Sequence, residues 1–579
     1  MTCMLKARAL AVVACALALV GALSRGGTAW SAQPPQFADV IYEHGEIYTP
    51  KGWAGAIAVK DGIMIAVGSD AEVSEFKAPR TRVVELHGAA VLPGLHDMHV
   101  HPTGSGQMLQ LQCLFPQGSK PPEVLTAIRA CVLKSGPRAW ITGGQWDAAS
   151  FGSHPPERAF LDRIAPDNPV ILADISGHSA WANTKALQIA GITAATPDPP
   201  GGIIERDSNG EPTGILRESA GALVRMHVPP YTLEQNMQAL SWALHEMLAQ
   251  GITSFTDAGV DGQIMQAYAA LADEGRLKQR VKACILWRPL IFSAGENSTA
   301  KYIAERNLYS RERFSPTCIK IVLDGVPTDG HTAAMVEPYA DATHPEAARA
   351  RGLLMVPTAV LDAAVTQLDA AGFTVKFHAA GDAAVRAGLD AIAAARRANG
   401  FTGHMHEVGH CSFVQMSDIV RARGIAATLE MSPYIWYPNP IIPDIAKAIG
   451  PERMKRWIPV KDAIDAGALV VPGSDWAVVP SVNPWIAIET LVTRQQPGGG
   501  GQVLGAVERI TLKQAIDLFT INSAREMGQS NELGSLARGL RADFVVLDRN
   551  PFRIPITEVH ATQVLMTVVN GEIVYRTKA

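Results

Sequence analysis

The chain has 579 residues, of which 47% are hydrophobic and 18% are charged, and its formal net charge is −4. This is the composition of an ordinary globular protein with ample apolar material for a core. No basic tract occurs along the chain, so we expect no nucleic-acid partner and favour a small-molecule substrate.

The first 32 residues have the layout of a secretory signal peptide. Lys6 and Arg8 form a short positive region, and an apolar run follows from Ala9 to Leu23. This run is shorter than the roughly 20 residues of a spanning helix, so we expect no stable membrane span. The protein is therefore predicted to be exported, either periplasmic or secreted. A lipoprotein signal at Cys15 is the weaker alternative.

Two segments near the ends of the chain share one sequence pattern. Residues 37–90 and residues 534–579 contain short alternating strands and turn signals such as Lys60-Asp61-Gly62, and neither shows helical periodicity. We interpret them as two halves of one composite β-sandwich domain.

Helical and strand patterns alternate between these two segments, from residue 91 to residue 533. Leu233–Gln250, for example, has the apolar spacing of an amphipathic helix and stops at Gly251, where a buried strand begins. Alternation of this kind predicts a parallel sheet covered by helices, and eight such units predict a closed (β/α)8 TIM barrel. The eight expected strands are Ala90–Leu92, Ile252–Thr256, Val281–Leu286, Cys318–Leu323, Phe373–His378, Glu407–His410, Ile425–Leu429 and Ala468–Pro472.

A long segment, about residues 103–228, interrupts the barrel after its first strand. It is rich in turns and tryptophans, and we expect it to form an inserted lobe over the barrel mouth. Cys113 and Cys131 flank one short helix-like stretch within it, so an oxidising compartment would allow a local disulfide between them. The alternative is that both are small buried hydrophobic residues.

Two histidines close the first apolar strand. Alternate residues of an extended strand share a face, so His99 and His101 point the same way. Two imidazoles on one face, at the carboxyl end of a barrel strand, are well placed to chelate a metal. The motif is weak alone, but the preceding Pro-Gly and Asp97 make it specific.

Three further candidate ligands lie at the ends of other expected strands. They are His378, His410 and Asp475. A lone histidine is more often an ordinary core or surface residue. Because each candidate falls at the functional end of its own strand, however, we interpret all three as metal ligands.

Lys320 stands inside an apolar strand, where a charged amine is costly unless it is paired or modified. Addition of CO₂ to the amine would give a carbamate, an anion with two oxygens that can bridge two divalent metals. The alternative is a lysine that extends to solvent or pairs with Asp324.

Several short motifs, spread over nearly the whole chain, complete this pattern. They are Pro93–Pro102, Gly177–Asn183, Gly201–Ile204, Pro212–Glu218, Gly251–Ser254, the Lys320 strand, His378–Ala384 and Gly473–Trp476. In this combination the sequence resembles the amidohydrolase superfamily, and within it the branch called amidohydrolase family 3 or YtcJ-like. The resemblance implies a metal-dependent hydrolase but does not single out a substrate.

The resemblance also implies how the ligands are shared. Two divalent metals would be bound, zinc being favoured and manganese, iron or cobalt allowed. The implied ligands are His99 and His101 for the first ion, His378 and His410 for the second, carboxylated Lys320 as the bridge, and Asp475 on the first ion. One departure follows the lysine strand, where the family often has a Gly/Ser-rich turn. Here His331 could approach the metals or the substrate, which leaves a single-metal site open.

The expected mechanism follows from these ligands. The metals would lower the pKa of a bound water to roughly 7, and the resulting hydroxide would attack a polarised carbonyl carbon. Asp475 would act first as base and then as acid toward the leaving nitrogen. By resemblance, His178 would stand near the substrate and stabilise the oxyanion. Its alternative role is a structural histidine beside Trp181.

Tryptophans near the barrel mouth are candidates for substrate contact. They are Trp146, Trp181 and Trp436. The aromatic loop Ser432–Pro440 suits a substrate with an apolar or aromatic group. The alternative is that such loop tryptophans form the core of the inserted lobe.

The leading interpretation is a hydrolase of C–N bonds other than ordinary peptide bonds, acting on an amide, an N-acyl or N-formyl amine, or a cyclic amide. The alternatives are a deaminase or an esterase-like hydrolase on the same centre, or a non-catalytic periplasmic binding or regulatory protein. A homodimer is compatible with the sequence.

Overall fold

The computed structural model describes residues 36–577 apart from ten short gaps. The gaps are residues 117, 147, 153–155, 175–178, 200–201, 288–298, 329–330, 343–347, 437–440 and 477. The expected signal peptide and His178 therefore lie outside the described residues.

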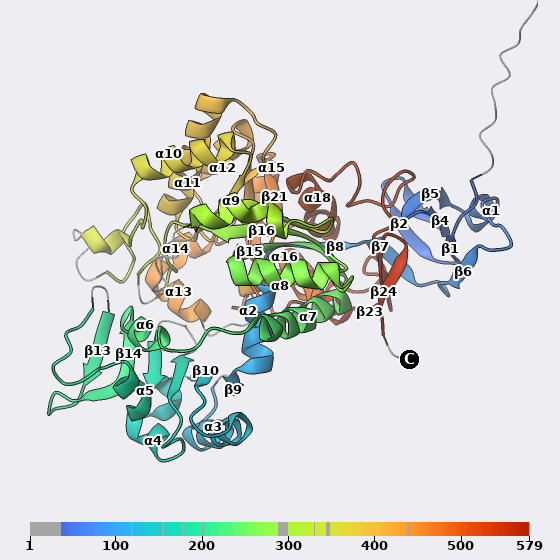
Figure 1. Cartoon of the computed structure of the whole chain (residues 1–579). Helices are drawn as coiled ribbons and strands as arrows, with labels where there is room; N and C mark the ends of the chain where they lie inside the picture. Colours follow the sequence, from blue (N-terminus) through green and yellow to red (C-terminus); the bar gives the residue numbers. More distant parts are fainter. Residues whose placement is uncertain are drawn as a thin grey trace, which may run out of the picture. The chain divides into compact units, whose positions relative to one another are not determined.

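Eight parallel strands follow one another around a barrel in the order of the sequence (Figure 1). They are β8 (Leu95–Val100), β15 (Ile252–Val260), β16 (Arg280–Leu286), β17 (Phe314–Val322), β18 (Thr374–Ala379), β19 (His406–His410), β20 (Ala427–Met431) and β21 (Leu469–Pro472). At the seam between the last and first strands, the backbone N–H of Asp475 donates to the carbonyl of His99 at 2.7 Å. This arrangement confirms the expected (β/α)8 barrel.

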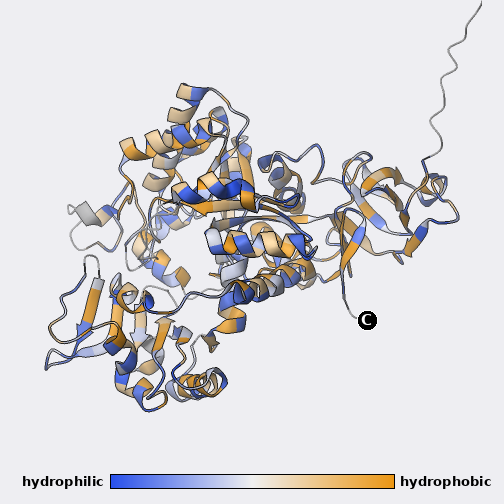
Figure 2. Cartoon of the chain, viewed as in Figure 1, coloured by the Kyte–Doolittle hydropathy of each residue, from blue (hydrophilic) through white to orange (hydrophobic). Residues whose placement is uncertain are grey.

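Helices cover the outside of these strands. They include α7 (Leu233–Ala249), α8 (Gly262–Asp273), α9 (Thr299–Tyr309), α10 (Thr358–Ala370), α11 (Asp382–Asn399), α12 (Met416–Gly424), α15 (Val460–Asp465) and α16 (Pro484–Thr493). Helix α7 begins with a capping box between Thr232 and Gln235 and gives way to Gly251, whose φ of +84° favours glycine. Figure 2 shows polar and apolar residues mixed along these helices, as expected for amphipathic elements with one buried face.

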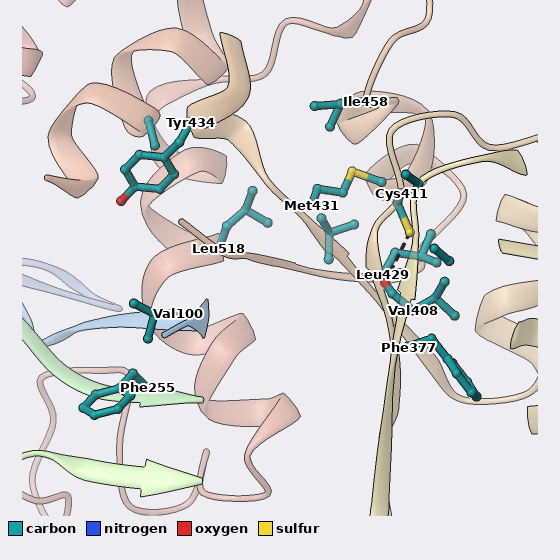
Figure 3. Packing of buried hydrophobic residues seen from close by; sticks show 14 of the residues in the cluster. Val100, Phe255, Phe377, Val408, Cys411, Leu429, Met431, Tyr434, Ile458 and Leu518 are labelled. Atoms are coloured by element: carbon teal, nitrogen blue, oxygen red, sulfur yellow. Dashed lines mark hydrogen bonds between the residues drawn. The ribbon is translucent and has the colours of Figure 1, made fainter. Parts of the chain in front are cut away.

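The strands separate an apolar exterior from a polar interior. Phe377, Val408 and Leu429, from neighbouring strands, belong to the apolar cluster that packs between barrel and helices (Figure 3). Alternate residues of a strand face opposite sides. Lys376 and Glu407, next to two of these residues in sequence, are ion-paired at 2.8 Å with both side chains fully buried. The barrel interior therefore carries the charges.

The first barrel strand differs from the expectation. Ala90–Leu92 belongs to β7 (Ala90–Pro93), which pairs with β2 and β22 outside the barrel, and the first barrel strand is β8. One extended run is thus shared by two sheets, with Gly94 between them. A Cβ on Gly94 would lie 2.3 Å from Thr253 Oγ1, so glycine is needed where the chain passes between sheets. The Pro93-Gly94 pair marks this division in the sequence, although the sequence pattern alone was interpreted as one strand.

The two terminal segments form two β-sheets that share a core. One sheet has the order β5-β4-β1-β6 and the other β24-β23-β22-β7-β2-β3. Their strands are β1 (Val40–Glu43), β2 (Glu46–Thr49), β3 (Gly52–Ala54), β4 (Ala56–Lys60), β5 (Ile63–Gly68), β6 (Arg82–Glu85), β22 (Phe544–Leu547), β23 (Val564–Val569) and β24 (Glu572–Arg576). Tyr42 and Phe544 meet edge to face in this core, with ring centroids 4.9 Å apart. Segments from both ends of the chain thus build one β unit, as the expected fold class requires.

The inserted segment has its own sheet and its own hydrophobic core. The sheet order is β13-β14-β12-β11-β10-β9. The strands are β9 (Cys113–Leu114), β10 (Ile141–Trp146), β11 (Val170–Asp174), β12 (Ser179–Ala182), β13 (Gly202–Arg206) and β14 (Pro212–Glu218), with α3 (Pro121–Ser135) among the helices against them.

Two disulfides link cysteines in the described part of the chain. Cys113 of β9 is bonded to Cys131 of α3, so the disulfide interpretation holds over the alternative of free buried thiols. Cys284 of β16 is bonded to Cys318 of β17, a pair that the sequence reasoning did not single out. Only the register of the parallel strands, which places these two residues opposite each other, reveals it.

No helix in the described part of the chain is long and apolar enough to cross a membrane.

Candidate metal centre

Three of the expected ligands converge at the carboxyl end of the barrel. Nε2 of His99 lies 3.7 Å from Oδ1 of Asp475, and Nε2 of His101 lies 3.4 Å from the same oxygen. His99 is the next-to-last residue of β8, whereas His101 already has a non-strand backbone and caps helix α2 (Pro102–Gly106). The two histidines thus meet through Asp475 although only one of them lies in the strand.

The second pair of expected histidines lies beside the first. The ring centroids of His410 and His99 are 4.6 Å apart, and those of His410 and His378 are 4.4 Å apart. Nδ1 of His410 is 4.0 Å from Oδ2 of Asp475. The structure therefore brings all four histidines and Asp475 into one group.

Lys320 reaches this group from β17. Its Nζ lies 3.1 Å from Nε2 of His99, and the residue is only 4% exposed. Burial, reinforced by the nearby charge of Lys376, lowers the pKa of Lys320 to about 7. Neither alternative for this lysine holds: it does not extend to solvent, and the carboxylate of Asp324 binds other groups.

Asp324 instead holds His378. Its Oδ1 accepts from Nδ1 of His378 at 3.1 Å and from the backbone N–H of Ala380, while its Oδ2 accepts from the N–H of Ala334 and Gly381. The hydrogen on Nδ1 leaves Nε2 of His378 as the free nitrogen. This contact was not expected from the sequence.

Burial sets the protonation of the histidines. It lowers the pKa of His99 well below the usual value, with a further contribution from the charge of Lys320. It also lowers the pKa of His410, reinforced by His378. Neutral imidazole is the form that binds metals, so these rings are in the binding state at neutral pH.

The backbone at the site is strained in two places. Asp475 has a φ of +56° and His410 a φ of +67°, both in the left-handed region that favours glycine. Such conformations cost about 1–3 kcal/mol each and persist where the surroundings impose them, often at functional sites. At both positions the turn comes as the chain leaves the strand, and the side chain joins the cluster.

Charged residues beneath the histidines were missed by the sequence reasoning. Oε2 of Glu430, on β20, accepts from Nδ1 of His99 at 2.6 Å, and Lys376 of β18 lies 3.6 Å from the same oxygen. The rule applied to Lys320, that a charge inside an apolar strand needs a reason, would have identified both.

Asp97 supports the turn that carries Asp475. Its Oδ1 accepts from the backbone N–H of Ser474 at 3.0 Å and of His99 at 3.1 Å. Burial raises the pKa of Asp97 to about 7. This residue therefore ties the first and last barrel strands together directly below the ligands.

The remaining expected site residues lie elsewhere. Trp146 donates from Nε1 to the carbonyl of Leu172, and Trp181 is fully buried, both in the core of the inserted lobe. The structure thus gives these two the core role that was the alternative. His331 pairs with Asp341 at 2.8 Å and stacks on Tyr339, with no contact to the four histidines among the described interactions. His178 and the side chain of Trp436 lie outside the described residues.

A surface cavity of about 1030 Å³ runs along α7 and contains none of the candidate ligands. Its lining includes Trp242, whose ring lies 5.9 Å from that of Trp476. The candidate site is therefore defined by converging side chains and not by this groove.

The donor set fits a divalent cation. His99, His101 and Asp475 each offer a ligand atom, and these atoms lie within 4.8 Å of one another. Imidazole nitrogen with carboxylate oxygen is a set that zinc, manganese, iron and cobalt accept. Glu430 accepts from Nδ1 of His99 and Asp324 accepts from Nδ1 of His378, and carboxylates commonly fix the tautomer of metal-binding histidines in this way.

Comparisons with known proteins agree with this geometry. A family model described as the amidohydrolase family matches residues 82–575. The YtcJ protein of Bacillus subtilis is 30% identical over 536 residues, covering 90% of this chain and 96% of the relative. The N-substituted formamide deformylase of Arthrobacter pascens is 28% identical over 533 residues, covering 90% of this chain and 95% of the relative.

The fold recurs in solved structures. That of an uncharacterized metal-dependent hydrolase from Pyrococcus furiosus matches with a TM-score of 0.70 at 23% identity, covering 89% of this chain and 100% of that chain. At this identity the likeness concerns the fold alone. The family match and the YtcJ relative go further: this chain belongs to the amidohydrolase family.

Proposed function

We propose that this amidohydrolase-type enzyme hydrolyses C–N bonds other than ordinary peptide bonds, in an amide, an N-acyl or N-formyl amine, or a cyclic amide. The observation that carries the proposal is the convergence of His99, His101 and Asp475 at the carboxyl end of the barrel. The name of the Arthrobacter pascens relative, an N-substituted formamide deformylase, supports the choice of bond.

We assign the ligands as the family resemblance implies. His99, His101 and Asp475 hold one divalent cation, zinc in the first instance, and His378 and His410 hold a second. Carboxylated Lys320 would supply an anionic ligand shared by the two ions, as the resemblance implies; its amine lies 3.1 Å from Nε2 of His99. Bound cations of this kind lower the pKa of water to roughly 7 and polarise a carbonyl oxygen.

Asp475 moves the proton in this proposal. Its carboxylate faces His99, His101 and His410 at 3.4–4.0 Å, and its side chain is 12% exposed. It is therefore close enough to the ligands to take a proton from water and open enough to pass that proton to a leaving nitrogen. His178, proposed to stabilise the oxyanion, lies outside the described residues.

Metal content and turnover test the proposal together. Elemental analysis of the purified protein should find about two equivalents of a divalent ion, and an acid-labile mass gain should match CO₂. Asp475→Asn keeps an oxygen ligand but removes the base, so much of the metal should remain while amide hydrolysis is abolished. No metal after reconstitution, or an Asp475→Asn variant with unchanged turnover, would refute the proposal.

A single-metal deaminase or esterase-like hydrolase is the second candidate. The compact group of His99, His101 and Asp475 favours it, because His378 is not part of that group in this structure. About one equivalent of metal without a labile mass would support this candidate over the bridged centre. Ammonia release from amino-substituted heterocycles, against amine release from N-acyl amines, separates the two reactions.

We further propose that the substrate carries an apolar or aromatic group. The short helix η4 (Pro433–Trp436) follows β20 directly, so its aromatic sequence leaves the barrel at the same end as the ligands. A series of N-acyl amines of increasing hydrophobicity should show rising kcat/KM. A flat series would contradict this part of the proposal.

We also propose that the protein is exported from the cytoplasm. Two disulfides in one chain are typical of oxidising compartments. Cell fractionation with intact-mass measurement tests this: we expect a periplasmic or secreted protein with four oxidised cysteines among the described residues. A cytoplasmic protein with free thiols would overturn it.

A further inference from the structure

The Nδ1 side of the His99 ring, which faces away from Asp475, makes a hydrogen bond of its own. Its Nδ1 donates to Oε2 of Glu430 at 2.6 Å, while its Nε2 faces Lys320 at 3.1 Å. A carboxylate oxygen can only accept in this contact, so the ring hydrogen sits on Nδ1 and Nε2 is left without a hydrogen. The contact with Glu430 therefore selects the tautomer that leaves Nε2 facing Lys320.

The carboxylate of Glu430 fills space that is free only because two neighbouring residues are glycines. A Cβ on Gly409 would lie 2.7 Å from Oε2 of Glu430, and a Cβ on Gly473 would lie 2.6 Å from its Oε1. The same atom on Gly473 would come within 2.4 Å of Cβ of His99. Any larger residue at these positions would displace Glu430 or His99.

Both oxygens of Glu430 are occupied by donors. Oε2 also accepts from the backbone N–H of His410 at 3.2 Å, and Oε1 accepts from the hydroxyl of Ser432 at 3.1 Å. The residue is fully buried. Glu430 therefore contacts two candidate ligands while its own lone pairs point at protein hydrogen-bond donors.

A chain of buried charges extends from Glu430 toward the start of the strands. Lys376 lies between Glu430 at 3.6 Å and Glu407 at 2.8 Å, and Glu407 pairs with Lys282 at 3.0 Å. Lys282 also pairs with Glu526. Alternating charge along this row stabilises each member in a medium where an unpaired charge would be costly.

Resting on the proposed function, we propose that Glu430 is a positioning residue for the metal centre. It holds the hydrogen on Nδ1 of His99, leaves Nε2 to bind the cation, and fixes the plane of the ring. Lys376 and Ser432 fix the carboxylate in turn. Glu430 touches neither substrate nor cation in this role.

Zn²⁺ affinity tests this role. Glu430→Gln keeps the shape of the side chain but loses its charge, and partners of metal-ligating histidines typically contribute 10–100-fold to metal affinity. We therefore expect the Zn²⁺ dissociation constant, measured by chelator competition, to rise by about 10–100-fold. The Co²⁺-substituted variant should show an altered visible spectrum, because the His99 ring is no longer held.

A matched control exists in the same chain. Oε2 of the fully buried Glu489 accepts from Nδ1 of His560 at 2.7 Å, and its partners include no candidate ligand. Glu489→Gln removes the same kind of contact and is expected to leave Zn²⁺ affinity and the Co²⁺ spectrum unchanged. Loss of affinity in both variants would mean a general effect on folding and would overturn the proposal.

The outcomes separate this inference from the proposed function. A wild-type protein that binds no Zn²⁺ would overturn both. Wild-type binding with an unchanged Glu430→Gln variant would overturn only the positioning role. Loss of a whole equivalent in that variant, as in His99→Ala, would make Glu430 a ligand itself and also overturn the role.

The tautomer of His99 can also be measured in protein that keeps Glu430, so the test does not depend on whether the Glu430→Gln variant folds. In ¹⁵N-histidine-labelled, metal-free protein, the His99 resonances are identified by their absence in His99→Asn. The Nδ1–H tautomer is expected. An Nε2–H tautomer would overturn the proposal whatever the variants do.

Discussion

Nζ of Lys320 lies 3.1 Å from Nε2 of His99, with both side chains inside the barrel. Burial and the charge of Lys376 lower the pKa of Lys320 to about 7. A large part of the amine is therefore unprotonated near neutral pH. Carboxylation by CO₂ requires such an unprotonated amine, because its lone pair forms the new N–C bond.

We predict that carboxylation of Lys320 falls as pH falls. The folded pKa is about 7, so the amine becomes protonated and unreactive toward CO₂ below that pH. Metal-free protein equilibrated with bicarbonate at pH 8 and at pH 6 should differ in an acid-labile mass gain, which is larger at pH 8. Lys320→Arg should lack the gain at both values and should bind about one equivalent of metal less.

Lys376 is the internal comparison for that experiment. Burial disfavours its charge, but Glu407 and Glu430 outweigh burial and raise its pKa. It should stay protonated and uncarboxylated at pH 8. A labile mass that survives in Lys320→Arg would contradict the assignment.

We predict that Glu526 makes stability fall with rising pH. Burial, reinforced by the nearby Glu407, raises the pKa of Glu526 from its usual 4.5 to about 8. The folded state therefore holds a proton that the unfolded state releases between these values. The contribution of this proton is fully present below pH 4.5 and is lost as pH rises toward 8.

Thermal melting across pH checks this. Wild type should lose melting temperature relative to Glu526→Gln as pH rises from 5 to 8, because glutamine carries no such proton. The control is Glu489→Gln, at a buried glutamate outside this network. Parallel curves for wild type and Glu526→Gln would show that the carboxyl is already ionised at pH 5.

The candidate ligands could be placed from the sequence because each lies at or just beyond the carboxyl end of a barrel strand, and in a parallel barrel these ends lie together. The pattern predicted His99, His101, His378, His410 and Asp475 without any contact information, and the structure brings them together. Glu430 was not found, since its role depends on which strands are neighbours and on the space beside Gly473.

The errors have a common cause. The division of Ala90–Val100 between two sheets depends on pairing with β22, which lies about 450 residues later in the chain. The Cys284–Cys318 bond likewise depends on strand register. The local sequence indicates the period of the hydrophobic residues and the positions of turns. Which strands pair across such distances is decided by tertiary packing, which the local sequence does not show.

We predict that the Cys284–Cys318 disulfide stabilises the barrel. The two residues are 34 apart in sequence, so loop-closure entropy gives about 3–4 kcal/mol for the cross-link. Replacing both by alanine should lower the free energy of unfolding by that order in a denaturant titration. The matched variant lacks Cys113 and Cys131, with a separation of 18 and an expected effect of about 3 kcal/mol on the same model.

The two disulfides should differ in their effect on metal binding. Cys318 lies two residues before Lys320 on the same strand, so its loss is expected to weaken Zn²⁺ binding, whereas loss of the lobe disulfide should not. Equal affinities in the two double variants would show that the wall of the barrel holds Lys320 without the cross-link.

The last prediction concerns Trp181. It is fully buried, with its ring centroid 5.5 Å from Phe151 and 6.2 Å from Trp146, so a truncation removes core volume from the lobe. Trp181→Ala should cost about 3–5 kcal/mol of unfolding free energy. At a temperature where the variant is folded, KM for an N-acyl amine should stay within about threefold of wild type, less than the tenfold that 1.4 kcal/mol of binding represents. A large rise in KM with unchanged stability would mean that the lobe opens during turnover and presents Trp181 to the substrate.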